Sequence, residues 1–344
     1  MGVLTACAVY GLIAPPLYGQ DAETKETYAE RYTFDAERNA WSADQDPVPN
    51  TEAGDLELAR RALARGESKT AKKLLKKWVK TYGTDAPRYD EALFYLGDVE
   101  FQRRNYMKAH ERYKELIDGY PGSAFIERAV RRDFIVAETF LAGEKQKFLG
   151  LAMFSADEEA LEILEDIIAG HPGSEMAEQA VRTRANHFYR EGDFDAAAIE
   201  LDRITRDYPR SRYARTASLR SAQATLASFP GVEFDASPLL AAEEKFRQFQ
   251  RAHPRFAEQQ RVDLVLDRIR NSQAEKLYVV AEYYERVRRP LAARSYYESL
   301  AKRWPESTWG ASARDRLTVM GYLASDASDR KSSEPSTEPP AGTP

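Results

Sequence analysis

The side chains that most often carry catalysis or bind metals are scarce in this chain. It has one cysteine, Cys7, and four histidines, which are His110, His171, His187 and His253. A lone cysteine excludes an internal disulfide and a zinc site built from cysteines. No two histidines stand at the close spacing of a metal-ligand pair, so we interpret them as packing or solvated residues. The sequence therefore predicts no metal and no cofactor.

Carboxylates are plentiful, but they do not form a recognisable catalytic motif. Runs such as Asp157-Glu158-Glu159 and Glu243-Glu244 are expected at helix starts, where acidic side chains interact favourably with the helix dipole. No Ser-His-Asp arrangement, metal-binding Glu-His motif, phosphate-binding loop or dinucleotide fingerprint stands in a suitable context. We therefore expect that the protein is not an enzyme.

The one reaction that the sequence suggests is lipidation of Cys7. Leu4-Thr5-Ala6-Cys7 has the pattern of a bacterial lipobox, in which the cysteine thiol is diacylated and the cysteine becomes the mature N-terminus. Only six residues precede Cys7, and the apolar run continues past it to Ala14. The uncharged residues 1–20 therefore leave two alternatives open, a lipoprotein signal or a secretion signal cleaved near Gly19.

A repeated sequence motif predicts the helices in the rest of the chain. An aromatic residue or a histidine occurs six times at the end of a helical pattern, and proline follows it in five copies. In every copy, alanine stands eleven residues before this ring, and large apolar residues stand seven and four residues before it. These offsets share one face of an α-helix, which the proline ends. The six ring residues are Tyr82, Tyr120, His171, Tyr208, His253 and Trp304.

A second helix follows each break, because apolar residues recur five and nine residues after the ring, as at Phe125 and Ala129. The sequence therefore predicts an all-α fold, a tetratricopeptide-type α-solenoid of about six helix pairs, as one array over residues 55–324. Residues 21–54 are predicted as an irregular, extended strap that packs on the first repeats. Residues 325–344 have the composition of a disordered tail.

Uneven intervals between the rings indicate insertions. The third unit is 51 residues long from ring to ring, whereas a plain unit has about 34. Its extra residues, 143–157, are predicted as a loop between two helices. Phe148, Leu151, Met153 and Phe154 make this insert apolar, so it is either buried against a neighbour or exposed for a partner. Burial is the favoured interpretation, and these four residues are also the best candidates for partner contact. A second insert, Phe229–Pro238, is predicted as a loop.

Charge is mixed along most of the chain. The net charge is −5, from 50 Lys and Arg against 55 Asp and Glu, so no basic excess indicates nucleic-acid binding. The predicted helix Ser68–Thr81 is an exception, because its charged residues are all lysines. Such a face attracts acidic partners or lipid head groups, but the simpler interpretation is a solvated face. The lysines are Lys69, Lys72, Lys73, Lys76, Lys77 and Lys80.

Two segments carry a resemblance to a known family. Leu93, Leu96, Gly97, Ala109, Tyr113 and Pro121 fall at the spacing of the tetratricopeptide signature. Ala274–Ser307 contains a long helix with paired tyrosines, a short turn at Arg288-Arg289-Pro290 and an Ala-Ala start to the next helix. Over about residues 55–317 the chain resembles the BamD family of outer-membrane assembly lipoproteins.

This resemblance implies a non-enzymatic scaffold at the periplasmic face of the outer membrane, either lipid-anchored or soluble in the periplasm. The implied partners are the large barrel-assembly subunit, contacted through the C-terminal repeats, and unfolded outer-membrane proteins, received by the N-terminal repeats. Nucleic acid is not among them. The alternative is another periplasmic tetratricopeptide adaptor, for example one that coordinates envelope division with peptidoglycan synthesis.

Overall fold

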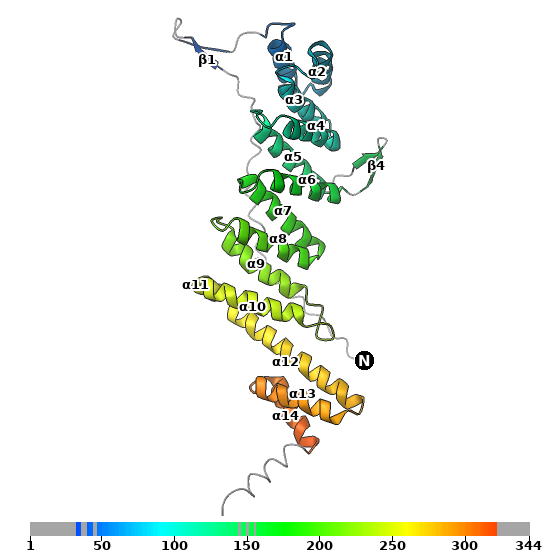
Figure 1. Ribbon diagram of the computed structural model, residues 1–344, viewed down its shortest axis with the longest axis vertical. Coiled ribbons are helices and arrows are strands. Elements are labelled where there is room, and N and C mark those ends of the chain that lie inside the picture. The colour runs from blue at the N-terminus through cyan, green and yellow to red at the C-terminus, as the bar shows by residue number, and fades with distance from the viewer. Residues whose placement is uncertain are drawn as a thin grey trace, which may run out of the picture. The chain divides into compact units, whose positions relative to one another are not determined.

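Pairs of α-helices joined by short turns make up most of the fold (Figure 1). The computed structural model describes residues 32–35, 40–43, 47–143, 146–148, 151–154 and 156–321, and for the four strands it describes the backbone. Cys7, the predicted signal over residues 1–20 and the predicted tail over residues 325–344 lie outside these ranges. The predicted all-α fold of tetratricopeptide type is confirmed, with six helix pairs among the described residues.

The chain divides into two compact units, Met1–Val136 with Gln146–Met153, and Ala137–Lys145 with Phe154–Pro344. The first unit contains α1 (Glu52–Ala64), α2 (Ser68–Tyr82), α3 (Tyr89–Gln102) and α4 (Tyr106–Gly119). The division falls within α5 (Ile126–Leu141). The second unit contains α6 (Asp157–Gly170), α7 (Glu175–Glu191), α8 (Phe194–Asp207), α9 (Ala214–Ala227), α10 (Ser237–Ala252), α11 (Pro254–Gln259), α12 (Val262–Arg286), α13 (Pro290–Arg303) and α14 (Thr308–Val319).

Four short strands occur where the sequence predicted irregular structure. β1 (Tyr32–Asp35) pairs antiparallel with β2 (Ala40–Ala43) inside the predicted strap. β3 (Gln146–Phe148) and β4 (Leu151–Phe154) form a second two-stranded sheet inside the insert, so the prediction of a plain loop there was wrong. β3 consists of Gln146, Lys147 and Phe148, so only its last residue is apolar, and a segment this short has no alternating pattern from which a strand could be predicted.

Burial confirms the predicted register of the repeats. The six alanines that precede a ring by eleven residues have no exposed surface, and the apolar residues seven and four before the ring are at most 3% exposed. Alanine at this position lets the two helices of a pair approach closely, and the large residues fill the space beside the crossing. The alanines are Ala71, Ala109, Ala160, Ala197, Ala242 and Ala293.

The ring residue ends the second helix of every pair except the first. Tyr120, His171, Tyr208, His253 and Trp304 are helix C-caps with φ between −127° and −136°. Each donates its backbone N–H to the carbonyl four residues earlier, and the proline behind it cannot continue the helix. Tyr82 is followed by Gly83 instead of proline, so α2 extends through Tyr82 and ends at Gly83, whose φ is 85°.

Four turns between paired helices share one Schellman motif. Gly66, Arg104, Gly192 and Arg288 occupy its left-handed position, with φ between 57° and 81°. In each turn the following residue donates its N–H to the carbonyl five residues earlier, at 2.9 Å. Glycine adopts this conformation without a steric penalty, whereas a Cβ is crowded there. Arg104 and Arg288 therefore hold strain that the other two turns avoid.

In the first unit, Gly97 permits the close approach of α3 and α4. A Cβ placed on Gly97 would lie 2.3 Å from Cε1 of Tyr113. Tyr113 is fully buried, and its hydroxyl donates a hydrogen bond to Oδ1 of Asp98 at 2.8 Å. Burial, and then the neighbouring Asp98 carboxylate, raise the pKa of Tyr113 well above its usual range. The ring cannot move away without leaving the buried Asp98 carboxylate short of a donor.

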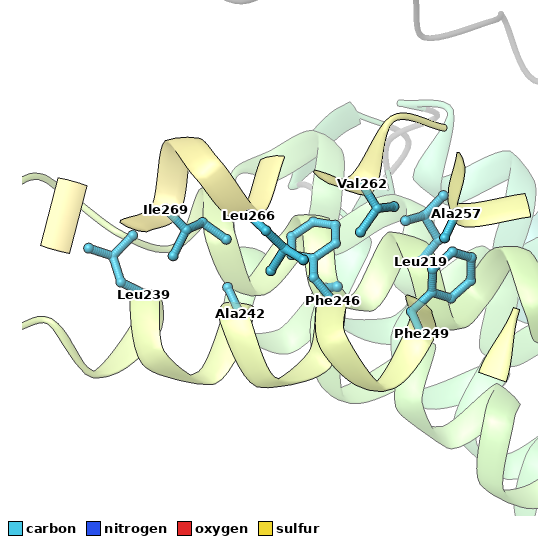
Figure 2. Close-up of a cluster of buried hydrophobic side chains, with 10 residues drawn as sticks. Leu219, Leu239, Ala242, Phe246, Phe249, Ala257, Val262, Leu266 and Ile269 are labelled. Carbon is cyan, nitrogen blue, oxygen red and sulfur yellow. The ribbon is translucent and has the colours of Figure 1, made fainter. Parts of the chain in front are cut away.

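In the second unit, α10 packs along α12 through a row of apolar side chains (Figure 2). Ala242 and Phe246 on α10 lie opposite Leu266 on α12. The sequence did not predict α11, which separates these two helices. Pro254 occupies its first position, where a missing N–H leaves no hydrogen bond unmade, and Ala257 is buried in the same cluster.

We expect Gly97→Ala to lower the free energy of unfolding by about 1–3 kcal/mol, because the added methyl group must displace the buried ring of Tyr113. Urea unfolding of the full chain measures the change. Gly119→Ala is the matched control, since a Cβ there has no atom within 4 Å. Equal stability of Gly97→Ala and the unaltered chain would contradict the close packing of α3 on α4.

We expect Arg288→Gly to stabilise the second unit slightly, by roughly 0.5 kcal/mol, because relief of the left-handed strain exceeds the entropy cost of glycine. Arg286→Gly, two residues earlier in the last turn of α12, should instead cost about 1 kcal/mol. Thermal unfolding of the two variants measures the difference. A loss of stability in both would show that Arg288 contributes more through its side chain than its backbone conformation costs.

Candidate partner-binding surfaces

The structure describes only part of the residues that the sequence predicted for binding. Cys7 lies outside the described residues. Phe148 lies on β3, and Leu151, Met153 and Phe154 lie on β4, so all four belong to one two-stranded sheet. The positions of their side chains are outside the described part of the chain. Their burial and their contact with a partner therefore stay predictions.

The four histidines are spread over the chain. His171 and His253 are helix C-caps, and His187 is buried beside the ring of Phe188. His110 pairs with the buried Asp133, with Nδ1 at 2.8 Å from Oδ1. Within the described ranges, no group of three or more His, Cys, Asp or Glu side chains is placed to hold a metal ion.

The two carboxylate runs occupy different places in their helices. Asp157, Glu158 and Glu159 occupy the first turn of α6, as predicted. Glu243 does not start a helix; it lies in the middle of α10, where the expectation was wrong. It accepts hydrogen bonds from Gln273 on α12 at 2.7 Å and from Arg247 at 2.6 Å. Burial raises its pKa, but these bonds outweigh burial, so the pKa lies below its ordinary value.

The second insert is a loop, as predicted, and it is attached to α12. Residues 229–236 form turns and bends between α9 and α10. Nζ of Lys276 on α12 donates a hydrogen bond to the carbonyl oxygen of Phe234, whose side chain is exposed. Near this loop's far end, Asp235 accepts a hydrogen bond from the backbone N–H of Ser237 at 3.2 Å, just before α10 begins.

A surface hollow of about 660 Å³ lies where α10, α11 and α12 meet. Glu258, Arg261, Asp263 and Leu264 are among its lining residues. Arg261 has a left-handed backbone, with a φ of 51°, which ends the short α11 and redirects the chain into α12. Acidic, basic and apolar groups are mixed in the lining, so the hollow does not indicate one class of ligand.

The clearest binding surface surrounds the turn between α12 and α13. Tyr283, Val287 and Leu291 are 52%, 45% and 74% exposed. Tyr283 and Val287 are four residues apart on one face of α12, and Leu291 lies in the first turn of α13. Arg286, Arg288 and Arg289 are also exposed around them. We call these six residues the α12–α13 surface. Exposed apolar residues beside arginines are typical of protein interfaces.

Tyrosine packing between α12 and α13 supports the α12–α13 surface. The rings of Tyr284 and Tyr296 stack with their centres 5.3 Å apart and their planes 12° from parallel. The hydroxyl of Tyr297 donates to Oε2 of Glu285 at 3.1 Å, and Arg316 on α14 pairs with the same carboxylate. Burial, and then the Glu285 carboxylate, raise the pKa of Tyr297 above its usual range. These contacts fix the helix ends that carry the exposed side chains.

Sequence reasoning did not identify the α12–α13 surface. The turn at Arg288-Arg289-Pro290 was predicted only as a connection between two helices. A signal was present, because Val287 and Leu291 are large apolar residues that stand outside the offsets of the buried face. Apolar residues outside the register of a repeat have no place in its core and are candidates for exposure.

Known protein families and solved structures share features with this chain. Among the described residues, no helix is both long and apolar enough to cross a lipid bilayer. Residues 56–124 match a tetratricopeptide repeat model. One solved structure with similarity to the chain is the crystal structure of PilW, a widely conserved type IV pilus biogenesis factor, at 16% identity over 77% of this chain and 99% of that chain, with a TM-score of 0.29. No curated protein matches the chain.

The second match identifies the family. Residues 153–330, just over half of the chain, match the family model YfiO, described as outer membrane lipoprotein. This match includes the segment Ala274–Ser307, which carried the resemblance to BamD-like lipoproteins in the sequence, and it confirms that resemblance. The chain therefore belongs to the YfiO family of outer membrane lipoproteins.

Proposed function

We propose that this protein is a non-enzymatic scaffold of the machinery that assembles β-barrel proteins in the outer membrane. Family membership over residues 153–330 is the observation that carries the proposal. It favours a place in the cell envelope, and the repeats in both units belong to a class of fold that binds other proteins. In this proposal the protein faces the periplasm, held by a lipid on Cys7 or free in that compartment.

The α12–α13 surface is the proposed contact with the large barrel-assembly subunit. It lies within the residues matched by the family model, and it combines an exposed tyrosine, two exposed aliphatic side chains and three arginines. Tyrosine and arginine are the residues that most often dominate the energy of an interface. The packing of Tyr284, Tyr296 and Tyr297 next to them holds the surface in place before a partner binds, which lowers the entropy cost of binding.

Unfolded barrel precursors are the second proposed partner, received by the repeats of the first unit and by the insert that contains β3 and β4. A two-stranded sheet leaves strand edges to which a further strand can be added. Segments destined for a β-barrel alternate apolar and polar residues and are able to supply such a strand. Phe148, Leu151, Met153 and Phe154 remain the proposed contacts in this insert.

The double substitution Val287→Asp and Leu291→Asp tests the first contact. We expect the full chain, purified from outer membranes, to bring down the large barrel-assembly subunit, and the double variant to bind it more than about tenfold more weakly, because two carboxylates would be desolvated in the interface. Ile199→Asp is the matched control, since Ile199 is 68% exposed on α8, outside the α12–α13 surface. Circular dichroism confirms that each variant is folded.

The pull-down, together with the phenotype of cells that lack the protein, separates the proposal from its alternative. Retention of the subunit by the double variant would exclude the α12–α13 surface as the contact. Absence of the subunit from the unaltered preparation, together with normal barrel insertion and failed division in cells that lack the protein, would favour an adaptor of envelope division instead.

A further inference from the structure

One side of α2 carries a dense stripe of lysines. Lys69, Lys73, Lys76 and Lys80 are exposed and follow one another at intervals of four, three and four residues, so they line one face of the helix. The stripe is roughly 16 Å long at 1.5 Å per residue. Ala71, Leu75 and Trp78 are buried on the opposite face. Lys77, also exposed, stands beside the stripe.

The lysines of the stripe have no acidic partner among the described residues. Lys72, at the edge of the basic face, pairs with Glu100 on α3. No ion pair joins Lys69, Lys73, Lys76, Lys77 or Lys80 to any described carboxylate, and α2 contains no acidic residue. Like charges four residues apart repel, and a lysine near a helix N-terminus opposes the helix dipole. Repulsion along the stripe disfavours the helix, and only Lys80, in the last turn, interacts favourably with the helix dipole, so the fold does not explain the stripe.

The choice of lysine over arginine indicates the kind of surface that the stripe meets. α2 has six lysines and no arginine, although arginine is the more frequent of the two in the chain as a whole. Arginine is enriched at protein interfaces and binds carboxylates through two parallel hydrogen bonds, whereas lysine is depleted there. Lysine is a hydrated point charge that suits diffuse attraction to an anionic surface.

We propose that the α2 stripe, defined as Lys69, Lys73, Lys76 and Lys80, rests on the anionic phospholipids of a bilayer. Membership in a family of outer membrane lipoproteins places such a surface within reach of the chain. The face contains no large exposed apolar side chain, so the contact is electrostatic and does not insert into the hydrocarbon. This contact fixes the orientation of the first unit on the membrane, and it is independent of the proposed scaffold function and of any lipid on Cys7.

Vesicle sedimentation tests the proposal. The full chain with Cys7→Ser, which removes any acyl group on that thiol, is mixed with vesicles of phosphatidylcholine alone or with added phosphatidylglycerol. We expect binding only when phosphatidylglycerol is present. We expect the variant with Lys69, Lys73, Lys76 and Lys80 all changed to Gln to bind at least about tenfold more weakly, since each lysine near an anionic leaflet strengthens binding roughly fivefold. Binding should also weaken as salt screens the charges.

Two further variants identify the cause of any loss. Changing Arg210, Arg255, Arg268 and Lys302 to Gln removes the same charge from exposed positions in the second unit that form no ion pair with a described residue, and should leave binding nearly unchanged. Changing the four stripe lysines to Arg keeps the charge and should preserve binding. Glutamine is a good helix former, so circular dichroism of α2 variants should match that of the unaltered chain.

Four results would overturn the proposal. Three of them concern vesicles: equal binding to neutral and anionic vesicles, full binding by the glutamine variant of the stripe, and an equal loss in the glutamine variant of the second unit. Binding of the stripe to an acidic protein without any binding to anionic vesicles would also overturn it. None of these results bears on the pull-down of the barrel-assembly subunit, so the two proposals fail separately.

Discussion

The close crossing of paired helices is the constraint on which both units depend. At each crossing an alanine has no exposed surface, and in the first unit Gly97 lets the ring of Tyr113 lie directly against the α3 backbone. A larger residue at these positions would separate the helices and open voids around the large apolar residues that follow. The ring residue then ends the second helix at a fixed position. It caps the helix in five of the six pairs, and there the proline that follows it cannot continue the helix. The pattern of the repeat is therefore short-range, because its four positions lie within twelve residues, and the long-range packing follows from it.

This short range explains which parts of the fold could be predicted from the sequence. The helix pairs, their buried faces and the turn at Gly66 depend on offsets within one helix or one turn, so a single sequence contains them. The pairing of β3 with β4 depends on contacts between two short segments that have little strand pattern of their own, so the sequence predicted a loop. The short α11 was hidden because Pro254 both ends one helix and starts another. The left-handed Arg104 and Arg288 could not be anticipated, since glycine is the residue expected there.

The candidate binding surfaces were harder to predict than the fold, and for a physical reason. An apolar residue in a sequence indicates burial, and only the arrangement of neighbouring helices decides which apolar residues stay exposed. Tyr283 and Tyr284 are adjacent in the sequence, yet Tyr284 stacks on Tyr296 whereas Tyr283 is half exposed. The lysines of α2 were visible in the sequence, but only the structure shows that five of the six lack an acidic partner among the described residues.

The two surfaces differ in chemistry in a way that suits different partners. The α12–α13 surface joins apolar side chains to arginines on helix ends that are held by packed tyrosines, which suits a partner of defined shape. The α2 stripe has charge without apolar contacts and without the two-pronged geometry of arginine, which suits a surface whose charges are mobile and have no fixed positions. A partner of defined shape binds more tightly to a rigid, partly desolvated surface, whereas binding to a fluid array of phosphates depends mainly on charge density. Each surface lacks the property that the other kind of partner requires, so we infer two different partners.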